Sequence, residues 1–563
     1  MAGNVAIGIQ SFDKLREEKY YYIDKTNFIR EWWESGDEVT LIARPRRFGK
    51  TLTMSMVEQF FSIDYKDRGD LFQGLSIWED ERYRQLQGSY PVINLSFANI
   101  KSTDFYSVKM EIYQILIDLY EKNRFLIKEG ILEGADEKFY NSISMEMPDY
   151  VATKALNKLS EFLYRYYDRK VIILLDEYDT PMQEAYVHGF WDEFVNFSRS
   201  LFNATFKTNS YLERGLMTGI TRVSKESIFS DLNNIEVVTT TSDKYATAFG
   251  FTEEEVFKSL EEFGYGDSKE DVKSWYDGFT FGNFSDIYNP WSIINFIDKG
   301  KIGTYWANTS SNSLVGNLIR KADIDIKNKF EDLLIGKRIR CPIDEQIVYN
   351  QMDENNNAIW SLLLASGYLK VITYDNLDEI SENADQMYEL AFTNREVHRM
   401  FRGIVQGWFM TAQRDYNEFV KSLLAGDIEA MNEYMNLVSE VMFSSFDTGK
   451  GPSKLQPERF YHGFVLGLIV ELADKYLITS NRESGFGRYD VMIEPKDITE
   501  DAFILEFKVY NPKKETSLED TVASAHAQIE EKLYEANLIA KGISVKKVHK
   551  YGFAFEGRKV LIG

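Results

Sequence analysis

The chain has 563 residues, of which 44% are hydrophobic and 15% are aromatic, so it is long and apolar enough for about three or four packed domains and is not a disordered chain. A single cysteine, Cys341, excludes an intrachain disulfide framework and a cysteine-based zinc site and is typical of a reducing compartment. The net charge of −23 argues against a generic basic nucleic-acid coat, and without a signal-peptide pattern or a long apolar stretch we expect a cytoplasmic protein with no membrane span.

The first part of the chain alternates short apolar runs with helical stretches. The runs lie at 38–43, 90–97, 170–177, 214–221 and 234–241. Buried strands that alternate with helices predict a parallel sheet with helices on both faces. We therefore predict an α/β domain over residues 1–245.

The middle of the chain is predicted to be mostly helical. A helical lid region is predicted over 246–335. Within it a helix begins after Thr252, whose hydroxyl would form a capping box with Glu255. A helix and strand at 359–375 and a strand at 388–394 predict a winged-helix-like module within a connector at 336–445. The turn-rich segment 446–458 marks the last boundary, and an α/β domain is predicted over 446–563.

The stretch LIARPRRFGKTLTMSM, residues 41–56, ends its loop in Gly49, Lys50 and Thr51. Because the triplet follows a predicted strand and opens a predicted helix, its backbone N–H groups and the helix N-terminus would face a phosphate. Lys50 would then reach the β- and γ-phosphates of a nucleotide, and the Thr51 hydroxyl would bind Mg²⁺. A G-K-T triplet alone is weak evidence, so a second half of the site is needed.

The apolar run VIILLDEYD supplies an acidic strand end. Asp176 would hold Mg²⁺, and Glu177 would orient and deprotonate the attacking water. The alternative is a buried strand that ends in an ordinary acidic turn. Arg222 follows another predicted strand and would contact the γ-phosphate; a surface salt bridge is an equally good interpretation of this arginine.

The entrance of the loop departs from the usual pattern, because Arg44 stands where that pattern has glycine and Pro45 lacks an N–H donor. We predict that Arg44, Arg46 and Arg47 compensate by bringing three positive charges near the phosphates.

Near the C-terminus, two predicted strands carry a second group of charged residues. Glu506 and Lys508 are two residues apart and therefore face the same side of their strand, and a hairpin would bring Asp490 beside them. Two carboxylates with a lysine suit a metal-dependent phosphodiesterase. The alternative is an exposed hairpin whose charges form cross-strand pairs.

Six motifs in order over about 280 residues resemble the AAA-ATPase-like bacterial proteins that carry a C-terminal nuclease-like domain. They are FDKLREEKYYYIDKTNFI, RPRRFGKT, LLDEYDTP, TGITR, WYDGFTFG and YNPWSI. The resemblance implies a P-loop NTPase domain that binds ATP at Lys50, Thr51 and Asp176, and RPRRFGKT is the usual form of the loop in that family.

The C-terminal spacing D-(15 residues)-E-x-K resembles the PD-(D/E)xK nuclease core. This resemblance implies a restriction-endonuclease-like fold with Mg²⁺, or Mn²⁺, held by Asp490 and Glu506. It adds Glu458, on a preceding helix, as a metal ligand and Gln528, on the following helix, as an auxiliary residue.

Two functions follow from these predictions. The first is an ATP-regulated, metal-dependent nuclease that cleaves DNA or RNA. The second is a non-catalytic, ATP-dependent switch that binds nucleic acid or protein through an inactive nuclease fold. A small-molecule kinase would need an acceptor pocket that the sequence does not indicate. Oligomeric state is left open, a homo-oligomer included.

Overall fold

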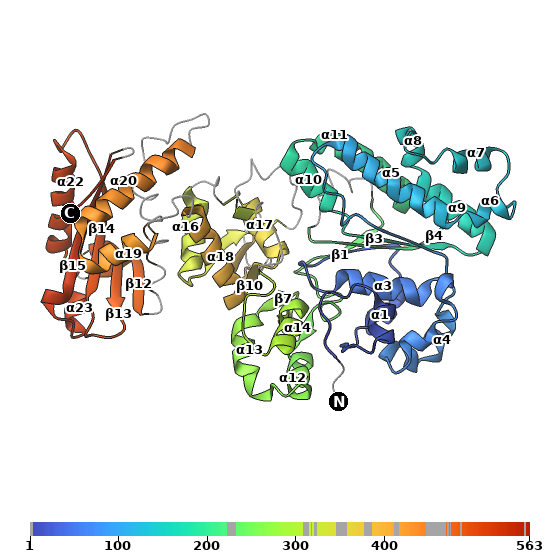
Figure 1. The fold of residues 1–563 in the computed structure, drawn as a ribbon, viewed down its shortest axis with the longest axis horizontal. Coiled ribbons are helices and arrows are strands. Elements are labelled where there is room, and N and C mark those ends of the chain that lie inside the picture. Colours follow the sequence, from blue (N-terminus) through green and yellow to red (C-terminus); the bar gives the residue numbers. More distant parts are fainter. Residues whose placement is uncertain are drawn as a thin grey trace. The chain divides into compact units, whose positions relative to one another are not determined.

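The computed structural model describes residues 4–221, 232–307, 315–316, 318–319, 324–344, 357–376, 385–409, 416–445, 465, 469, 472, 475–484, 487–556 and 559–563 (Figure 1). The chain divides into two units, each with its own core. The first comprises Met1–Lys321 and Arg338–His398, and the second comprises Ala322–Lys337 and Arg399–Gly563. Among the described helices, none combines the length and the apolar character that crossing a membrane requires.

The first unit is built on a five-stranded parallel sheet. Its strands are β1 (Val39–Ala43), β2 (Val92–Ser96), β3 (Val171–Asp176), β4 (Leu212–Gly219) and β5 (Ile235–Val238), in the order β2-β3-β4-β1-β5. All neighbours pair in parallel. The five strands predicted from the apolar runs are therefore confirmed, and β4 lies between β1 and β3.

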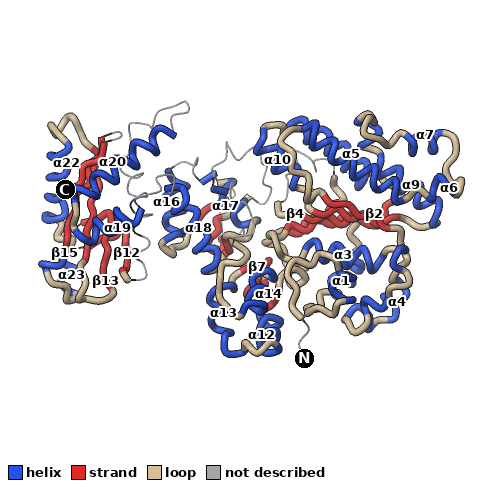
Figure 2. Tube along the Cα trace, in the orientation of Figure 1, coloured by secondary structure: helices blue, strands red, loops and turns tan. Residues whose placement is uncertain are grey.

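Helices cover both faces of this sheet (Figures 1 and 2). One face carries α5 (Phe105–Lys122), α9 (Ala155–Tyr167) and α11 (Trp191–Phe202), and the other carries α1 (Phe12–Glu17), α3 (Lys50–Phe61) and α4 (Glu81–Leu86). On the α3 side, Phe60 and Val57 pack in one buried cluster with Ile172, Leu174 and Leu216 of the sheet. The predicted layered α/β fold is confirmed.

The remaining helices of this region are short. They are α2 (Asn27–Ser35), α6 (Phe125–Lys128), α7 (Ala135–Asn141), α8 (Asp149–Ala152) and α10 (Thr180–His188).

After the sheet come α12 (Glu253–Glu262), α13 (Lys269–Tyr276) and α14 (Pro290–Lys299). The predicted capping box is confirmed, because Thr252 Oγ1 accepts the Glu255 N–H and the Glu255 carboxylate accepts the Thr252 N–H. A small antiparallel sheet of β6 (Phe251–Thr252), β8 (Phe284–Tyr288) and β7 (Phe279–Phe281) accompanies these helices. The sequence did not predict this sheet, because its strands are too short to show a period.

A second small sheet completes the first unit. It contains β9 (Ile339–Pro342), β10 (Leu369–Tyr374) and β11 (Met387–Phe392), in the order β10-β11-β9. The helix α17 (Ala358–Ala365) lies between β9 and β10 in the chain. The helix and strand predicted at 359–375 and the strand predicted at 388–394 are confirmed. Their grouping as a winged-helix-like module stays a prediction.

The second unit contains a mixed five-stranded sheet in sequence order. Its strands are β12 (Tyr476–Ser484), β13 (Gly487–Pro495), β14 (Ala502–Val509), β15 (Val548–Glu556) and β16 (Lys559–Ile562). The pair β14 and β15 is parallel and the other pairs are antiparallel. The unit also contains α16 (Ile324–Leu334), α19 (Tyr416–Ala425), α20 (Ile428–Ser445), α22 (Leu518–Glu531), α23 (Ala536–Ala540) and most of α18 (Arg395–Phe409).

Alternation along β14 separates two cores. Phe503, Leu505 and Phe507 pack in a cluster with residues of α19 and α20. Ala502 and Ile504 pack instead with α22 and α23. Because Glu506 and Lys508 continue the second series, they lie on the α22 side of the sheet. The boundary predicted at 446–458 lies outside the described residues, and the division into four domains stays a prediction.

Candidate functional sites

The loop between β1 and α3 closes around the Lys50 ammonium group. Lys50 Nζ donates hydrogen bonds to the backbone oxygens of Arg44 (2.8 Å) and Pro45 (2.9 Å). Gly49 precedes α3 with a φ of 82°, in the left-handed region that glycine adopts without strain. Burial lowers the pKa of Lys50, against the field of Glu177, Asp179 and Asp176. The loop therefore holds a buried cation at the N-terminus of a helix.

Thr51 and Asp176 meet at the carboxyl edge of the sheet. The Thr51 hydroxyl donates to Asp176 Oδ2 at 2.8 Å, and the Thr218 hydroxyl, on the intervening β4, donates to Asp176 Oδ1. Burial raises the pKa of Asp176, and the hydrogen bonds from Thr218 and Thr51 oppose that rise. The two residues predicted to share an ion are thus in direct contact, with Thr218 orienting the carboxylate.

Glu177 follows β3 with a φ of 51°, an uncommon conformation for a residue other than glycine. Its backbone N–H donates to Thr218 Oγ1 (3.3 Å), and its carboxylate accepts the Thr180 hydroxyl (3.2 Å). The side chain is half-buried and lies close enough to Lys50 to stabilise the ammonium charge. Glu177 therefore lies near Lys50 of the loop, and its role with the attacking water stays a prediction.

Sequence analysis missed Asp179. Its buried carboxylate accepts the N–H groups of Ile220 and Thr221, each at 2.9 Å, and the Thr221 hydroxyl at 3.0 Å. A Cβ on the neighbouring Gly219 would lie 2.5 Å from a ring carbon of Tyr178, so this approach requires glycine. Asp179 thus fixes the chain that leaves β4, and only its presence in LLDEYDTP gave a signal.

The three arginines of the loop have different partners. Arg44 is fully buried, its guanidinium donates to the backbone oxygens of Thr239 and Lys244, and it lies 4.3 Å from the centre of the Phe281 ring. Burial lowers its pKa to about 9. In this arrangement Arg44 holds the loop to the segment 239–244, and its predicted contact with phosphates, which would require it to leave these bonds, stays a prediction.

The other two arginines lie closer to the surface. Arg46 donates to Gln183 Oε1 (3.3 Å), and Arg47 lies 4.3 Å from the centre of the Trp291 ring. Their contact with phosphates stays a prediction. Arg222 and Glu458 lie outside the described residues.

The second group of charged residues converges on the α22 side of β13 and β14. Asp490 Oδ2 accepts the Phe507 N–H at 2.8 Å, which fixes Asp490 against β14. Lys508 Nζ donates to Gln528 Oε1 at 2.7 Å, and Gln528 Nε2 donates to Glu506 Oε1. The structure therefore brings together all four of the predicted residues that it describes here, and Gln528 joins the lysine to the glutamate.

Tyr534 belongs to the same network and was missed by sequence analysis. Its hydroxyl accepts a hydrogen bond from Gln528 Nε2 at 3.2 Å, and its side chain is 1% exposed. Burial raises its pKa, and the nearby Glu506 and Asp490 contribute to the rise. Tyr534 follows the end of α22, so strand periodicity gave no indication of it.

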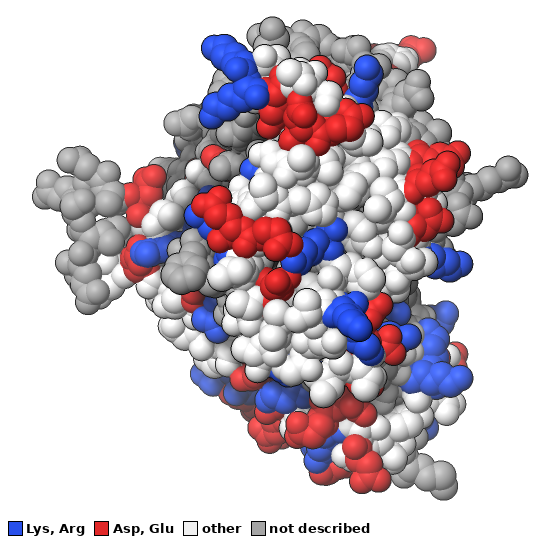
Figure 3. Space-filling model, turned by 90° about the vertical axis from the view of Figure 1, so that its left-hand side faces the viewer, with Lys and Arg blue, Asp and Glu red and all other residues white. Residues whose placement is uncertain are grey.

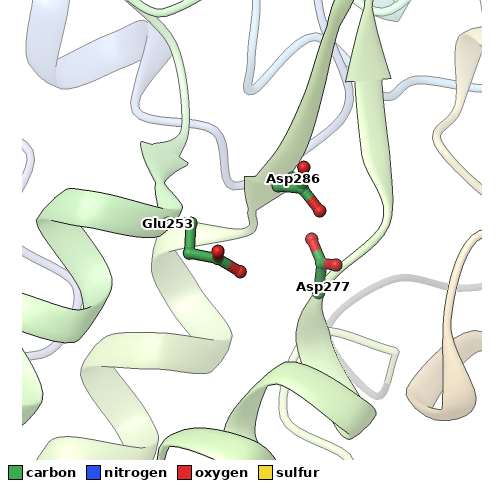
Figure 4. A group of neighbouring side chains, drawn as sticks. All are labelled: Glu253, Asp277 and Asp286. Atoms are coloured by element: carbon green, nitrogen blue, oxygen red, sulfur yellow. The ribbon is translucent and has the colours of Figure 1, made fainter.

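A third group of acidic residues lies in the helical region of the first unit (Figure 4). Glu253 of α12, Asp277 after α13 and Asp286 of β8 have carboxylate oxygens within 4.8 Å of one another. Lys273 pairs with Glu253 and lies 3.8 Å from Asp286, and the Tyr288 hydroxyl donates to Glu253 at 3.2 Å. Lys273 thus neutralises part of the negative charge of these three carboxylates.

Burial, followed by the charge of Asp286, raises the pKa of Asp277 to about 6. The folded state therefore binds more protons than the unfolded state between about pH 4 and pH 6, so this residue's contribution to stability falls as the pH rises through that window. We expect Asp277→Asn to remove that fall. At pH 7.5 the free energy of unfolding should rise by about 1 kcal/mol, a value discounted for partial exposure.

Urea unfolding of the wild type and the variant across pH 4 to 8 measures this difference. Asp267→Asn, which changes an exposed aspartate on the nearby 3₁₀ turn, is the control and should follow the wild type. A constant difference between wild type and Asp277→Asn at every pH would contradict the prediction.

Comparisons with known proteins agree with this arrangement. Residues 6–229 match the family described as Predicted AAA-ATPase, and residues 456–563 match the PD-(D/E)XK nuclease superfamily. A relative from Azotobacter chroococcum mcd 1, described as an uncharacterized protein in the vnfD 5' region, is 25% identical over 401 residues, which cover 69% of this chain and 67% of that protein. Two regions of the chain are thus similar to these two families, the first to the predicted AAA-ATPase family and the second to the PD-(D/E)XK nuclease superfamily, in the order that the sequence motifs predict.

Proposed function

We propose that the protein binds ATP at the loop of residues 44–51 and hydrolyses it, and that its C-terminal domain is a metal-dependent nuclease acting on DNA or RNA. The direct contact between Thr51 and Asp176 supports the first half. The network that joins Lys508, Gln528 and Glu506 beside Asp490 supports the second.

The donor set at the ATPase site fits Mg²⁺. A threonine hydroxyl and a carboxylate are hard oxygen donors of the kind that Mg²⁺ prefers, and both come from rigid elements. When bound, the ion would compensate the negative charge of the β- and γ-phosphates. Thr218 keeps the Asp176 carboxylate aimed at this position by holding its other oxygen.

Lys50 and Glu177 would perform the remaining steps at this site. Lys50 would exchange its bonds to the Arg44 and Pro45 oxygens for phosphate oxygens, which are stronger, charged acceptors. Glu177 would orient a water molecule and take its proton. Two contacts support that role, because Thr218 accepts the Glu177 backbone N–H and the Thr180 hydroxyl donates to the Glu177 carboxylate.

The donor set at the nuclease site also fits a divalent ion. Asp490 and Glu506 offer carboxylate oxygens from neighbouring strands on one face of the sheet, and such ligands suit Mg²⁺ or Mn²⁺. The ion would polarise the scissile phosphate. Lys508 would position or activate the attacking water, and Gln528 would hold the lysine and the buried glutamate in register.

One observation favours the alternative, a binding module that does not cut. Several lysines of the second unit are already paired: Lys541 with Glu494 at 2.7 Å and Lys550 with Glu530 at 2.6 Å. On the face drawn in Figure 3, basic residues (blue) and acidic residues (red) are intermixed. A nuclease usually presents a positive track to the phosphate backbone, so the substrate would have to bind elsewhere or be short.

Degradation assays separate the two functions. Plasmid DNA, single-stranded DNA and RNA are incubated with the full chain and Mg²⁺ or Mn²⁺, with and without ATP, while phosphate release is followed in parallel. We expect metal-dependent cutting of at least one polymer and ATP-dependent phosphate release. Phosphate release from ATP without cutting of any polymer would support the switch that does not cut nucleic acid.

A further inference from the structure

The carbonyl group of Arg46, within the phosphate loop, is tied to residues far along the chain. Arg46 O accepts the indole N–H of Trp306 at 3.0 Å and the side-chain amide of Asn289 at 3.4 Å. Trp306 is 3% exposed, and its ring packs against Phe279. The loop is therefore held from the side of α14 and of the segment that follows it.

Trp306 is held in turn by Glu396. The Glu396 carboxylate, 1% exposed, accepts the backbone N–H groups of Trp306 (2.6 Å) and Ala307 (3.3 Å) through Oε1, and the Ser292 hydroxyl (2.7 Å) through Oε2. Burying a carboxylate costs free energy unless hydrogen-bond donors surround it. These three donors therefore stabilise Glu396 in this one position. We call Arg46, Asn289, Ser292, Trp306 and Glu396 the loop brace.

Glu396 lies in the first turn of α18, and this helix passes from one unit into the other. Residues 395–398 belong to the first unit, and the remainder of α18 belongs to the second. Asn394 caps the helix by accepting the Val397 N–H at 3.0 Å. A movement of Glu396 would therefore displace the first turn of α18, because Glu396 is part of that turn.

We propose that Trp306 and Glu396 are positioning residues for the phosphate loop and that, through them, nucleotide occupancy of the loop changes the stability of the first turns of α18. The inference rests on the proposed ATP site. When Lys50 turns to a phosphate, the Arg44 and Pro45 oxygens lose their donor and the loop must readjust. The next carbonyl, that of Arg46, is hydrogen-bonded to the Trp306 indole, and the Trp306 backbone N–H is hydrogen-bonded to Glu396. A movement of the loop at Arg46 would therefore displace Trp306, and Trp306 would displace Glu396.

The test is amide hydrogen exchange in the full chain with and without AMP-PNP and Mg²⁺, with binding measured in parallel by calorimetry. In the wild type we expect AMP-PNP to change exchange in peptides covering residues 395–409 by about fivefold, the lower range of typical coupling. Trp306→Phe keeps the ring and removes the indole N–H. This variant should still bind AMP-PNP but lose the response in α18.

Trp32→Phe is the matched control, since it also removes a buried indole N–H, one that donates to Thr40 at 3.2 Å, away from Arg46. It should keep the response. Glu396→Gln keeps the shape and an acceptor but not the charge, so its response should be partial; a full response would remove Glu396 from the route.

Three outcomes separate the inference from the proposed function. A wild type that binds AMP-PNP without any response in α18 overturns the inference alone, and so does a full response in Trp306→Phe. A wild type that does not bind AMP-PNP overturns the proposed ATP site and the inference with it.

Discussion

Replacing Lys50 with alanine is expected to lower the affinity for ATP by about 100-fold, because a hydrogen-bonded ammonium group contributes about 3 kcal/mol to binding an anion. The change also removes the donor of the Arg44 and Pro45 oxygens, which leaves both carbonyls at the mouth of the loop. Isothermal titration of the purified full chain with ATP and Mg²⁺ measures the effect.

Lys66→Ala is the matched control, since Lys66 is an exposed lysine of the same unit and should leave the affinity unchanged. Circular dichroism should show that both variants keep their secondary structure, and the nuclease assay without ATP should show that the second unit still folds. An affinity for ATP in Lys50→Ala equal to that of the wild type would exclude Lys50 from the site.

Replacing Glu506 with glutamine is expected to reduce metal-dependent cutting by about 1,000-fold, because loss of a ligand to a catalytic ion removes several kcal/mol of transition-state stabilisation. Glutamine keeps the size of this side chain, which is 2% exposed, so the sheet and α22 should remain packed. The measurement is the initial rate of cutting of whichever polymer the wild type degrades, at saturating Mn²⁺.

Glu531→Gln changes a glutamate at the end of α22 whose side chain is 76% exposed, and it should cut at the wild-type rate. Thermal unfolding of both variants separates loss of chemistry from loss of fold. If Glu506→Gln cut as fast as Glu531→Gln, the carboxylate of Glu506 would have no part in the reaction.

The strands, and several of the candidate residues that lie on them or directly after them, could be predicted because the sequence signals for them are local. The strands β1 and β3 are mostly apolar and buried along their whole length, which is typical of parallel strands, and β3 ends directly in Asp176. The phosphate loop follows β1, and Lys50 and Thr51 open the next helix. The period of two along β14 was enough to predict that Glu506 and Lys508 share a face, and the face packed by Ala502 and Ile504 agrees with it.

The features that could not be predicted depend on contacts between distant residues. Nothing near Arg44 indicates that backbone oxygens about 200 residues later, at Thr239 and Lys244, receive its guanidinium. Asp179 was missed because its partners, Ile220 and Thr221, follow the end of the neighbouring strand β4, about 40 residues later in the chain. Tertiary hydrogen bonds of this kind leave no periodic signal, since one donor and one acceptor suffice.

The account depends on two separate centres in one chain, each binding a divalent ion: one at Thr51 and Asp176, the other at Asp490 and Glu506. Crystals grown with AMP-PNP and Mn²⁺, measured at the manganese absorption edge, test this most directly. The account predicts two anomalous peaks, one between Thr51 and the nucleotide phosphates and one between Asp490 and Glu506. A single peak, or manganese bound only elsewhere, would contradict it.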